Sequence, residues 1–262
     1  MTDDGVGRSI FGADVAGYEH GRPKYPEAVY SALEASGALS PGVDAFEVGP
    51  GTGQATGRLI EVGVASLVAI EPDMRLAAHL AARYPAATVL NSGFEDAGLE
   101  SGSFDLGVAA TSFHWIDPQR GLSRVAALLR PGGWWAMWWN LVHDPAGDAF
   151  SRAVLPLLRE VTLPPSLTGR DHVHWSLDFA SRLAEMRAAG MVDPAATMLE
   201  FDVEMSAKQL RALYATFSMI RRLDPLIAAA TLDAIERVAW DTFGGTVRRT
   251  FRVPLYLARK PE

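Results

Sequence analysis

Short apolar runs alternate with amphipathic stretches along the first half of the chain. The apolar runs predict buried strands at residues 43–48, 66–70, 88–90, 104–110 and 134–140. Positions with helical spacing predict helices at residues 26–35, 55–62, 74–84 and 118–129. Because strands and helices alternate, the sequence predicts an α/β fold with a largely parallel sheet.

The pattern is looser beyond residue 140. Further helices are predicted at residues 148–161, 177–189 and 207–240, the last divided into two at Asp224-Pro225. Further strands are predicted at residues 197–203 and 246–257. The stretch 141–175 is rich in proline and bears aromatic residues, and we expect it to cover a site. Extension of the core and a dimer contact remain alternatives for this stretch.

Three glycines at alternate positions follow the first predicted strand. Gly49, Gly51 and Gly53 separate the apolar run 43–48 from the amphipathic stretch 55–62, which predicts a strand, a tight turn and a helix. Glycine permits positive φ angles in such a turn and lets a ligand approach the backbone. The amides at the start of the following helix then suit an anionic group.

The spacing of these glycines differs from the dinucleotide-binding pattern, which places glycine at the first, third and sixth positions. The sixth position is Gln54 when counted from Gly49 and Thr56 when counted from Gly51. A nicotinamide-dependent oxidoreductase is therefore disfavoured, although it remains an alternative.

An acidic residue follows the second predicted strand. Glu71 lies about 20 residues beyond the first glycine of the turn, the interval at which an acidic side chain reaches a ribose in nucleotide-binding α/β folds. A carboxylate can accept hydrogen bonds from both ribose hydroxyls. We expect Glu71 to bind a ribose, and the alternative is a solvated carboxylate at a strand end.

Composition and charge limit the classes of partner. The chain has 262 residues and a net charge of −7, which argues against an extended basic surface for nucleic acid. It has no cysteine, which excludes disulfides, thiolate metal sites and cysteine nucleophiles. We find neither a run of ~18 apolar residues nor a signal-like N-terminus, and we expect a cytoplasmic protein without a membrane span.

The glycine turn, read as Glu47-Val-Gly49-Pro-Gly51-Thr-Gly53, resembles motif I of the class I S-adenosylmethionine-dependent methyltransferases. Further matching segments are Tyr18, Arg22-Pro-Lys-Tyr25-Pro, Ile70-Glu71-Pro-Asp73, Gly93-Phe-Glu95-Asp, Ser103-Phe-Asp105-Leu, Phe113-His114-Trp115 and Leu129-Arg-Pro131-Gly-Gly133. Together they are similar to the small-molecule branch of types 11 and 25, and in particular to trans-aconitate methyltransferase-like proteins.

The resemblance implies a Rossmann-like fold. We expect a seven-stranded, mostly parallel sheet with an antiparallel last strand, helices on both faces and helical lid insertions. Residues 1–262 would form a single methyltransferase domain. Its expected parts are a core at about 26–140, 176–204 and 246–262, an N-terminal cap at 1–25, and lids at about 141–175 and 206–241. A homodimer is left open.

The resemblance also implies which residues bind S-adenosylmethionine. The matching positions are Tyr18, Arg22, Glu47, Gly49, Gly51, Gly53, Glu71, Pro72, Phe94, Glu95 and Thr111. Phe94 would form a ring wall or offer its backbone amide beside the adenine, with Glu95 near the exocyclic amine. Relatives often carry an aspartate where this chain has Gly93, which weakens the assignment of the adenine contact.

His114 follows the fourth predicted strand, where ligands of open α/β sheets bind. It is our candidate catalytic residue, either as a general base or as a hydrogen-bond donor that orients the methyl acceptor. The alternative is that His114 only anchors its loop. Candidate acceptor-binding residues are Tyr25, Trp115 and Asn140. We expect the acceptor pocket to form between His114, the segment 18–25 and the stretch 141–175.

These observations predict methyl transfer from S-adenosylmethionine to an oxygen or nitrogen of a small molecule, with a carboxylate or hydroxyl acceptor favoured. A non-catalytic S-adenosylmethionine-binding protein is a further alternative. Nucleic-acid methylation is disfavoured because Ala110-Thr-Ser-Phe113 replaces the Asn/Asp-Pro-Pro-Tyr motif of amino-methylating enzymes. No metal is expected, since His172-Val-His174 lacks the further ligands that would complete a metal site.

Overall fold

The computed structural model describes residues 21–142, 148–158, 167–168 and 173–262. The chain divides into two compact units. The larger unit comprises Tyr25–Trp139, Thr168–Leu199 and Val253–Glu262, and the smaller comprises Met1–Lys24, Asn140–Leu167 and Glu200–Arg252. The assignment of residues 1–262 to a single domain stays a prediction.

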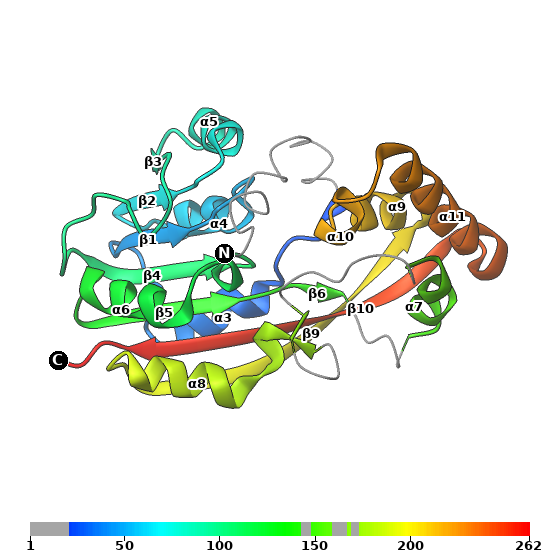
Figure 1. The fold of residues 1–262 in the computed structure, drawn as a ribbon. Helices are drawn as coiled ribbons and strands as arrows, with labels where there is room; N and C mark the ends of the chain where they lie inside the picture. Colours follow the sequence, from blue (N-terminus) through cyan, green and yellow to red (C-terminus); the bar gives the residue numbers. More distant parts are fainter. Residues whose placement is uncertain (1–20, 143–147, 159–166, 169–172) are drawn as a thin grey trace. The chain divides into compact units, whose positions relative to one another are not determined.

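Five parallel strands form most of the sheet of the larger unit (Figure 1). In the order of their hydrogen bonding they are β3 (Thr88–Leu90), β2 (Ser66–Ile70), β1 (Asp44–Val48), β4 (Phe104–Ala110) and β5 (Leu129–Trp138). The central strands β1 and β4 are almost wholly buried, as expected for parallel strands covered on both faces.

Two long strands follow these five in the sequence. β10 (Thr246–Arg259) runs antiparallel to β5, and β9 (Val192–Ser206) pairs with β10. The predicted mostly parallel sheet with an antiparallel last strand is therefore confirmed. Among the described residues eight strands are linked by hydrogen bonds, one more than predicted, because the two-residue β6 (Leu141–Val142) also pairs with β10.

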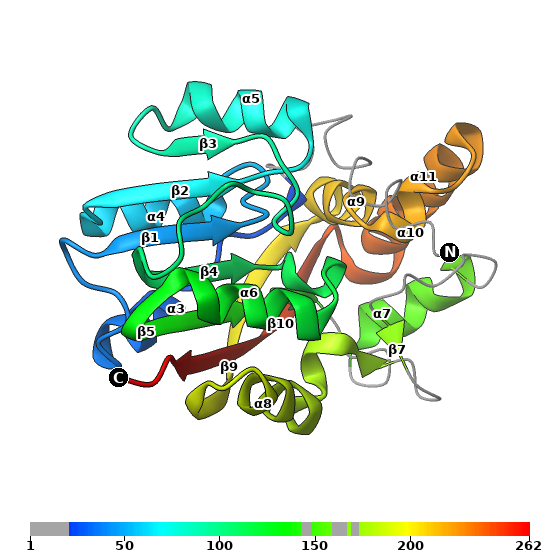
Figure 2. The same cartoon turned by 60° about the vertical axis from the view of Figure 1, so that its left-hand side comes forward.

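Helices cover both faces of the sheet in the larger unit, as the sequence predicts. They are α3 (Glu27–Ala35), α4 (Gln54–Val62), α5 (Met74–Arg83), α6 (Pro118–Leu128) and α8 (Phe179–Ala188). Figure 2 shows α6 and α8 on one face, with α3 and α4 on the other. The start of α5 is fixed by Asp73, whose carboxylate accepts hydrogen bonds from the amides of Arg75 and Leu76.

Strand β5 begins at Leu129, five residues before the start predicted from the sequence. The segment Arg130-Pro-Gly-Gly suggests a turn, but it lies within the strand as an irregularity. Leu129 pairs with Phe104, whereas Trp134 already pairs with Leu106, so the extra residues form a bulge on β5. Gly132, with φ of 74°, supplies the conformation that this bulge requires.

The smaller unit is mostly helical. Its elements include α7 (Ala149–Val154), the 3₁₀ helix η3 (Leu155–Leu158), α9 (Ala207–Ala215), α10 (Ser218–Arg221) and α11 (Pro225–Phe243). The helix predicted at 148–161 is α-helical only to Val154, because Pro156 cannot continue an α-helix. The predicted break at Asp224-Pro225 is confirmed, with Asp224 capping α11.

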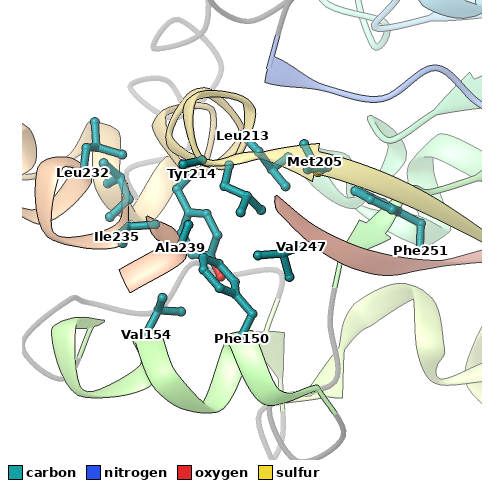
Figure 3. Close-up of a cluster of buried hydrophobic side chains, with 13 residues drawn as sticks. Phe150, Val154, Met205, Leu213, Tyr214, Leu232, Ile235, Ala239, Val247 and Phe251 are labelled. Atoms are coloured by element: carbon teal, nitrogen blue, oxygen red, sulfur yellow. The ribbon is translucent and has the colours of Figure 1, made fainter. Parts of the chain in front are cut away.

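A hydrophobic cluster forms the core of the smaller unit (Figure 3). Phe150 of α7 packs against Tyr214 of α9, with ring centroids 6.2 Å apart. Ile235 of α11 and Phe251 of β10 are also fully buried in this cluster. The amphipathic faces predicted for these helices therefore bury apolar surface within the unit.

The predicted cover at 141–175 is described only in part. Besides β6, α7 and η3 it contains the two-residue strands β7 (Leu167–Thr168) and β8 (Val173–His174). No helix in the described part of the chain is both long and apolar enough to cross a membrane.

Candidate functional site

The glycine turn joins β1 to α4 with three residues in the left-handed region. The φ angles of Gly49, Gly51 and Gly53 are 63°, 59° and 86°. A Cβ at Gly49 would lie 2.6 Å from the Cβ of Ser112, so this glycine is required for packing. A Cβ at Gly51 would meet no atom of the described residues within 4 Å, so the backbone at this position is open to a ligand as far as those residues are concerned.

The carboxylate of Glu71 closes the turn from the end of β2. Its Oε2 accepts a hydrogen bond from the Gly51 amide at 3.0 Å, and its Oε1 accepts one from the Asp73 amide at 2.9 Å. Glu71 is only 4% exposed. Because a carboxylate has about four lone-pair positions, each oxygen retains capacity to accept one more hydrogen bond.

A second carboxylate, that of Glu47, is buried in β1 beneath the turn. Its Oε2 accepts a hydrogen bond from the Thr56 hydroxyl of α4 at 2.6 Å. Burial, with a contribution from the neighbouring Glu71, raises the pKa of Glu47 to about 7. Burial likewise raises the pKa of Glu71 to about 7, although the Asp73 and Gly51 amides act in the opposite direction. The glycine turn is therefore packed against two carboxyl groups, those of Glu47 and Glu71, whose pKa values are both raised to about 7.

The end of β4 contacts this turn directly. The hydroxyl of Ser112 donates a hydrogen bond to the carbonyl of Val48, at the end of β1. Thr111 has φ of 58°, an unfavourable conformation for a β-branched residue and one that recurs at functional sites. Its amide bonds to the carbonyl of Trp138 at 2.7 Å, and its hydroxyl lies 2.9 Å from that of Tyr25. Tyr25 and Thr111 are thus brought together beside the glycine turn.

His114 lies in the 3₁₀ helix η2 (Phe113–Trp115), immediately after β4. The indole N–H of Trp139 donates to its Nδ1 at 3.0 Å. The ring centroid of Trp115 lies 5.0 Å from that of His114, and the ring centroid of His174 lies 5.6 Å from it. Trp175 completes the group by packing edge-on against Trp139 at 5.4 Å. We call these five residues the His114 cluster.

Three other predicted cofactor residues also lie in the larger unit. The ring of Phe94 is buried and stacks on Phe46 at 6.0 Å, so its backbone, rather than its ring, is the group able to face a ligand. Glu95 is half-buried. The carbonyl of Pro72 accepts a hydrogen bond from the Asn91 amide. Their predicted roles around the adenine stay predictions.

Of the remaining predicted residues, two belong to the smaller unit and one lies outside the described residues. Arg22 belongs to the smaller unit, where its Nε donates to Thr216 at 2.8 Å. Asn140 is also in the smaller unit, and its side-chain amide donates to the carbonyl of Pro23 at 3.0 Å. Tyr18 lies outside the described residues. The acceptor pocket predicted from the segments 18–25 and 141–175 therefore stays a prediction.

The two histidines that suggested a metal site are described only in part. His172 lies outside the described residues, whereas His174 bonds through Nδ1 to Ser176. Within the described part of the chain, no three His, Asp or Glu side chains are grouped closely enough to hold a metal. That the chemistry needs no metal stays a prediction.

Two contacts of the site were missed at the sequence level. Thr56 is the third residue of α4, and nothing in the sequence pairs it with the carboxylate of Glu47. Trp139 is one of four tryptophans within residues 134–139, and it is fully buried. Its position at the end of a strand beside His114 was the available signal for its hydrogen bond.

A comparison with protein-family models matches residues 46–137 to a methyltransferase domain. Among curated proteins, an uncharacterised methyltransferase of Mycobacterium tuberculosis is 34% identical over 175 residues. That alignment covers 63% of this chain and 70% of the relative. The matched segment contains the glycine turn, Glu71 and the Phe113-His114-Trp115 segment.

Solved structures with the same fold include a protein of Anaeromyxobacter dehalogenans assigned as a type II methyltransferase. It is 26% identical, with a TM-score of 0.65, and the match covers 92% of this chain and 99% of that one. A phosphoethanolamine N-methyltransferase of Haemonchus contortus, solved with S-adenosylhomocysteine, is 14% identical with a TM-score of 0.58. That match covers 98% of this chain and 60% of the other, and at this identity it supports the fold alone.

The two raised pKa values predict how stability depends on pH. A carboxyl whose pKa is raised by folding stabilises the fold fully below its ordinary pKa of about 4.5, and this contribution is lost as the pH rises through about 7. We therefore expect the free energy of unfolding to fall between pH 5 and pH 8. Glu47→Gln keeps a hydrogen-bond acceptor for the Thr56 hydroxyl but cannot ionise. The decrease in the free energy of unfolding should therefore be roughly 3 kcal/mol smaller in this variant than in the wild type.

Chemical denaturation of the ligand-free protein at pH 5 and pH 8 measures this effect. The exposed Glu34→Gln on α3 is the matched control and should leave the pH dependence unchanged. If Glu47→Gln shifts the stability equally at both pH values, Glu47 does not ionise near pH 7 in the folded protein.

Proposed function

The chain belongs to the class I S-adenosylmethionine-dependent methyltransferases, and we propose that it methylates an oxygen or nitrogen of a small molecule, with a carboxylate or hydroxyl acceptor favoured. Its cofactor is S-adenosylmethionine, and the oxidoreductase alternative is removed by family membership. The identity of the acceptor and the residues that bind it are the proposed part.

Three features of the larger unit support Glu71 and the glycine turn as the cofactor site. The oxygens of Glu71 each retain capacity for one more hydrogen bond, which suits the two hydroxyls of a ribose. Gly51 faces open space where a ligand could approach the backbone. The hydroxyl of Thr52 in the same turn is buried and has no hydrogen-bond partner in the described part of the chain, as expected of a group that a ligand satisfies.

When bound, S-adenosylmethionine supplies a methyl group on a positively charged sulfur, which a lone pair of the acceptor displaces. This step needs no covalent help, so the contribution of the protein is to orient the acceptor and exclude water. Orientation alone accounts for ~7–11 kcal/mol in well-aligned reactions. Tyr25 and Thr111 would act beside the reacting atoms, because the neighbouring Ser112 contacts the glycine turn at Val48.

The His114 cluster is the observation that carries the small-molecule proposal. It brings together the aromatic side chains of Trp115, Trp139 and Trp175 and the imidazoles of His114 and His174. Apolar walls with a few fixed polar groups are typical of sites for small ligands. A nucleic-acid acceptor would instead favour a basic surface, whereas this chain has a net charge of −7.

Replacing Gly51 tests the cofactor site, and a control at a second glycine separates loss of binding from the effect of backbone strain. We expect Gly51→Val to abolish S-adenosylmethionine binding, because its side chain would occupy the open space before the turn. Gly63→Val is the matched control, since Gly63 also has positive φ and a Cβ there would meet only Pro41 at 3.9 Å. Both variants should lose similar stability, and calorimetric titration should show binding only in the control. Retained affinity in Gly51→Val would contradict the site.

A panel of acceptors tests the proposed function. The purified chain is incubated with S-adenosylmethionine carrying a labelled methyl group and with small carboxylates, phenols, alcohols and amines. We expect label on one of the carboxylates or hydroxyl compounds, and a large loss of transfer in Gly51→Val. Label found solely on RNA, DNA or protein would contradict a small-molecule acceptor. Binding of the cofactor without transfer to any class would instead favour the non-catalytic alternative.

A further inference from the structure

The hydrogen bond between Trp139 and His114 fixes the protonation of the histidine. Trp139 is fully buried, and its indole Nε1 donates to the Nδ1 of His114 at 3.0 Å. An indole N–H can only donate a hydrogen bond, so Nδ1 must be the accepting nitrogen. The neutral ring of His114 therefore carries its proton on Nε2.

The same bond disfavours a doubly protonated ring. A proton on Nδ1 would face the indole N–H of Trp139 and leave that buried donor unsatisfied, which is costly in a closed core. Among the described residues, the titratable groups packed around this cluster are His174 beside the ring and Arg182. The guanidinium of Arg182 lies 3.8 Å from the centroid of Trp175 and is paired with Glu185.

The neighbouring histidine is held in the same neutral form. His174 caps the 3₁₀ helix η4 (Trp175–Leu177), with its Nδ1 accepting a hydrogen bond from the amide of Ser176 at 3.2 Å. Its neutral ring therefore also carries the proton on Nε2. The segment is held in place by hydrogen bonds from Tyr256 to the carbonyl of Ser176 and from Arg182 to that of Trp175. Two imidazoles in contact thus share the same neutral form.

We infer that Trp139 is a positioning residue that holds His114 as a neutral ring protonated on Nε2, so that His114 acts toward the acceptor as a hydrogen-bond donor and not as a general base. A base must present a nitrogen with a free lone pair, and the lone pair of Nδ1 is engaged by Trp139. The role toward the acceptor rests on the proposed function, whereas the protonation of the ring does not.

Nitrogen NMR of ¹⁵N-histidine-labelled full-length protein reads the ring form without any acceptor. We expect His114 at neutral pH to show a proton on Nε2 and none on Nδ1. Trp139→Phe removes the donor, and a mixture of ring forms should then appear. Trp135→Phe is the matched control, because Trp135 is equally buried in the preceding strand β5 and its indole N–H has no hydrogen-bond partner among the described residues. That variant should leave the His114 signals unchanged.

A wild-type His114 with its proton on Nδ1, or doubly protonated at neutral pH, would overturn the inference. So would a Trp139→Phe spectrum identical to that of the wild type. These outcomes do not test the proposed class of acceptor, because no substrate is present in the experiment.

Turnover with an acceptor identified from the panel tests the role of the ring. Glutamine can donate near the position of Nε2 but cannot accept the proton, so His114→Gln should be ~10-fold or more faster than His114→Ala. The pH profile of kcat for the wild type should lack a rise attributable to a deprotonating histidine, and Trp139→Phe should introduce a pH dependence.

Equal loss of ~10²-fold in both His114 variants, with a rate that rises as histidine deprotonates, would establish a base and overturn the donor role. Full activity in both would instead contradict the placement of His114 in the acceptor site.

Discussion

The hydrogen bond between Glu71 and the amide of Gly51 is the constraint on which the rest of the site depends. Parallel pairing of β1 with β2 places Val48 opposite Ile70, and the amide of Gly49 bonds to the carbonyl of Ile70 at 2.9 Å. The residues that follow these strand ends are therefore held together although they are 20 positions apart. Backbone amides donate to both oxygens of this carboxylate and offset part of the cost of burying it, although its pKa remains raised to about 7.

The position of the loop after β4 depends on the glycine turn through Gly49. Because this residue lacks a Cβ, the chain at Ser112 can approach the turn closely, and the end of β4 is fixed against β1. Pairing of β4 with β5 then brings His114 next to Trp139. Strand order thus places the proposed cofactor residues of the glycine turn near the loop that carries His114, our proposed acceptor residue.

The sequence was sufficient to predict features that depend on local chemistry. The parallel strands, the glycine turn and the break before Pro225 each follow from short-range patterns, and all are confirmed. Features set by packing between distant segments were not predictable. The bulge near Gly132, the stacking of Phe94 on Phe46 and the bond from Trp139 to His114 depend on which strands become neighbours. The stretch 141–175 has no comparable short-range pattern in the sequence, so its predicted role as a cover stays a prediction.

Calorimetric titration of Glu71→Ala with S-adenosylmethionine tests the central claim most directly. Loss of a charge-assisted partner for the ribose should weaken binding by ~2–4 kcal/mol, which corresponds to roughly 30- to 900-fold in Kd. The exposed Glu34→Ala serves as the control and should bind as the wild type does. Thermal unfolding establishes that both variants are folded at the temperature of the titration. Unchanged affinity in a folded Glu71→Ala protein would contradict the assignment of this carboxylate to the cofactor.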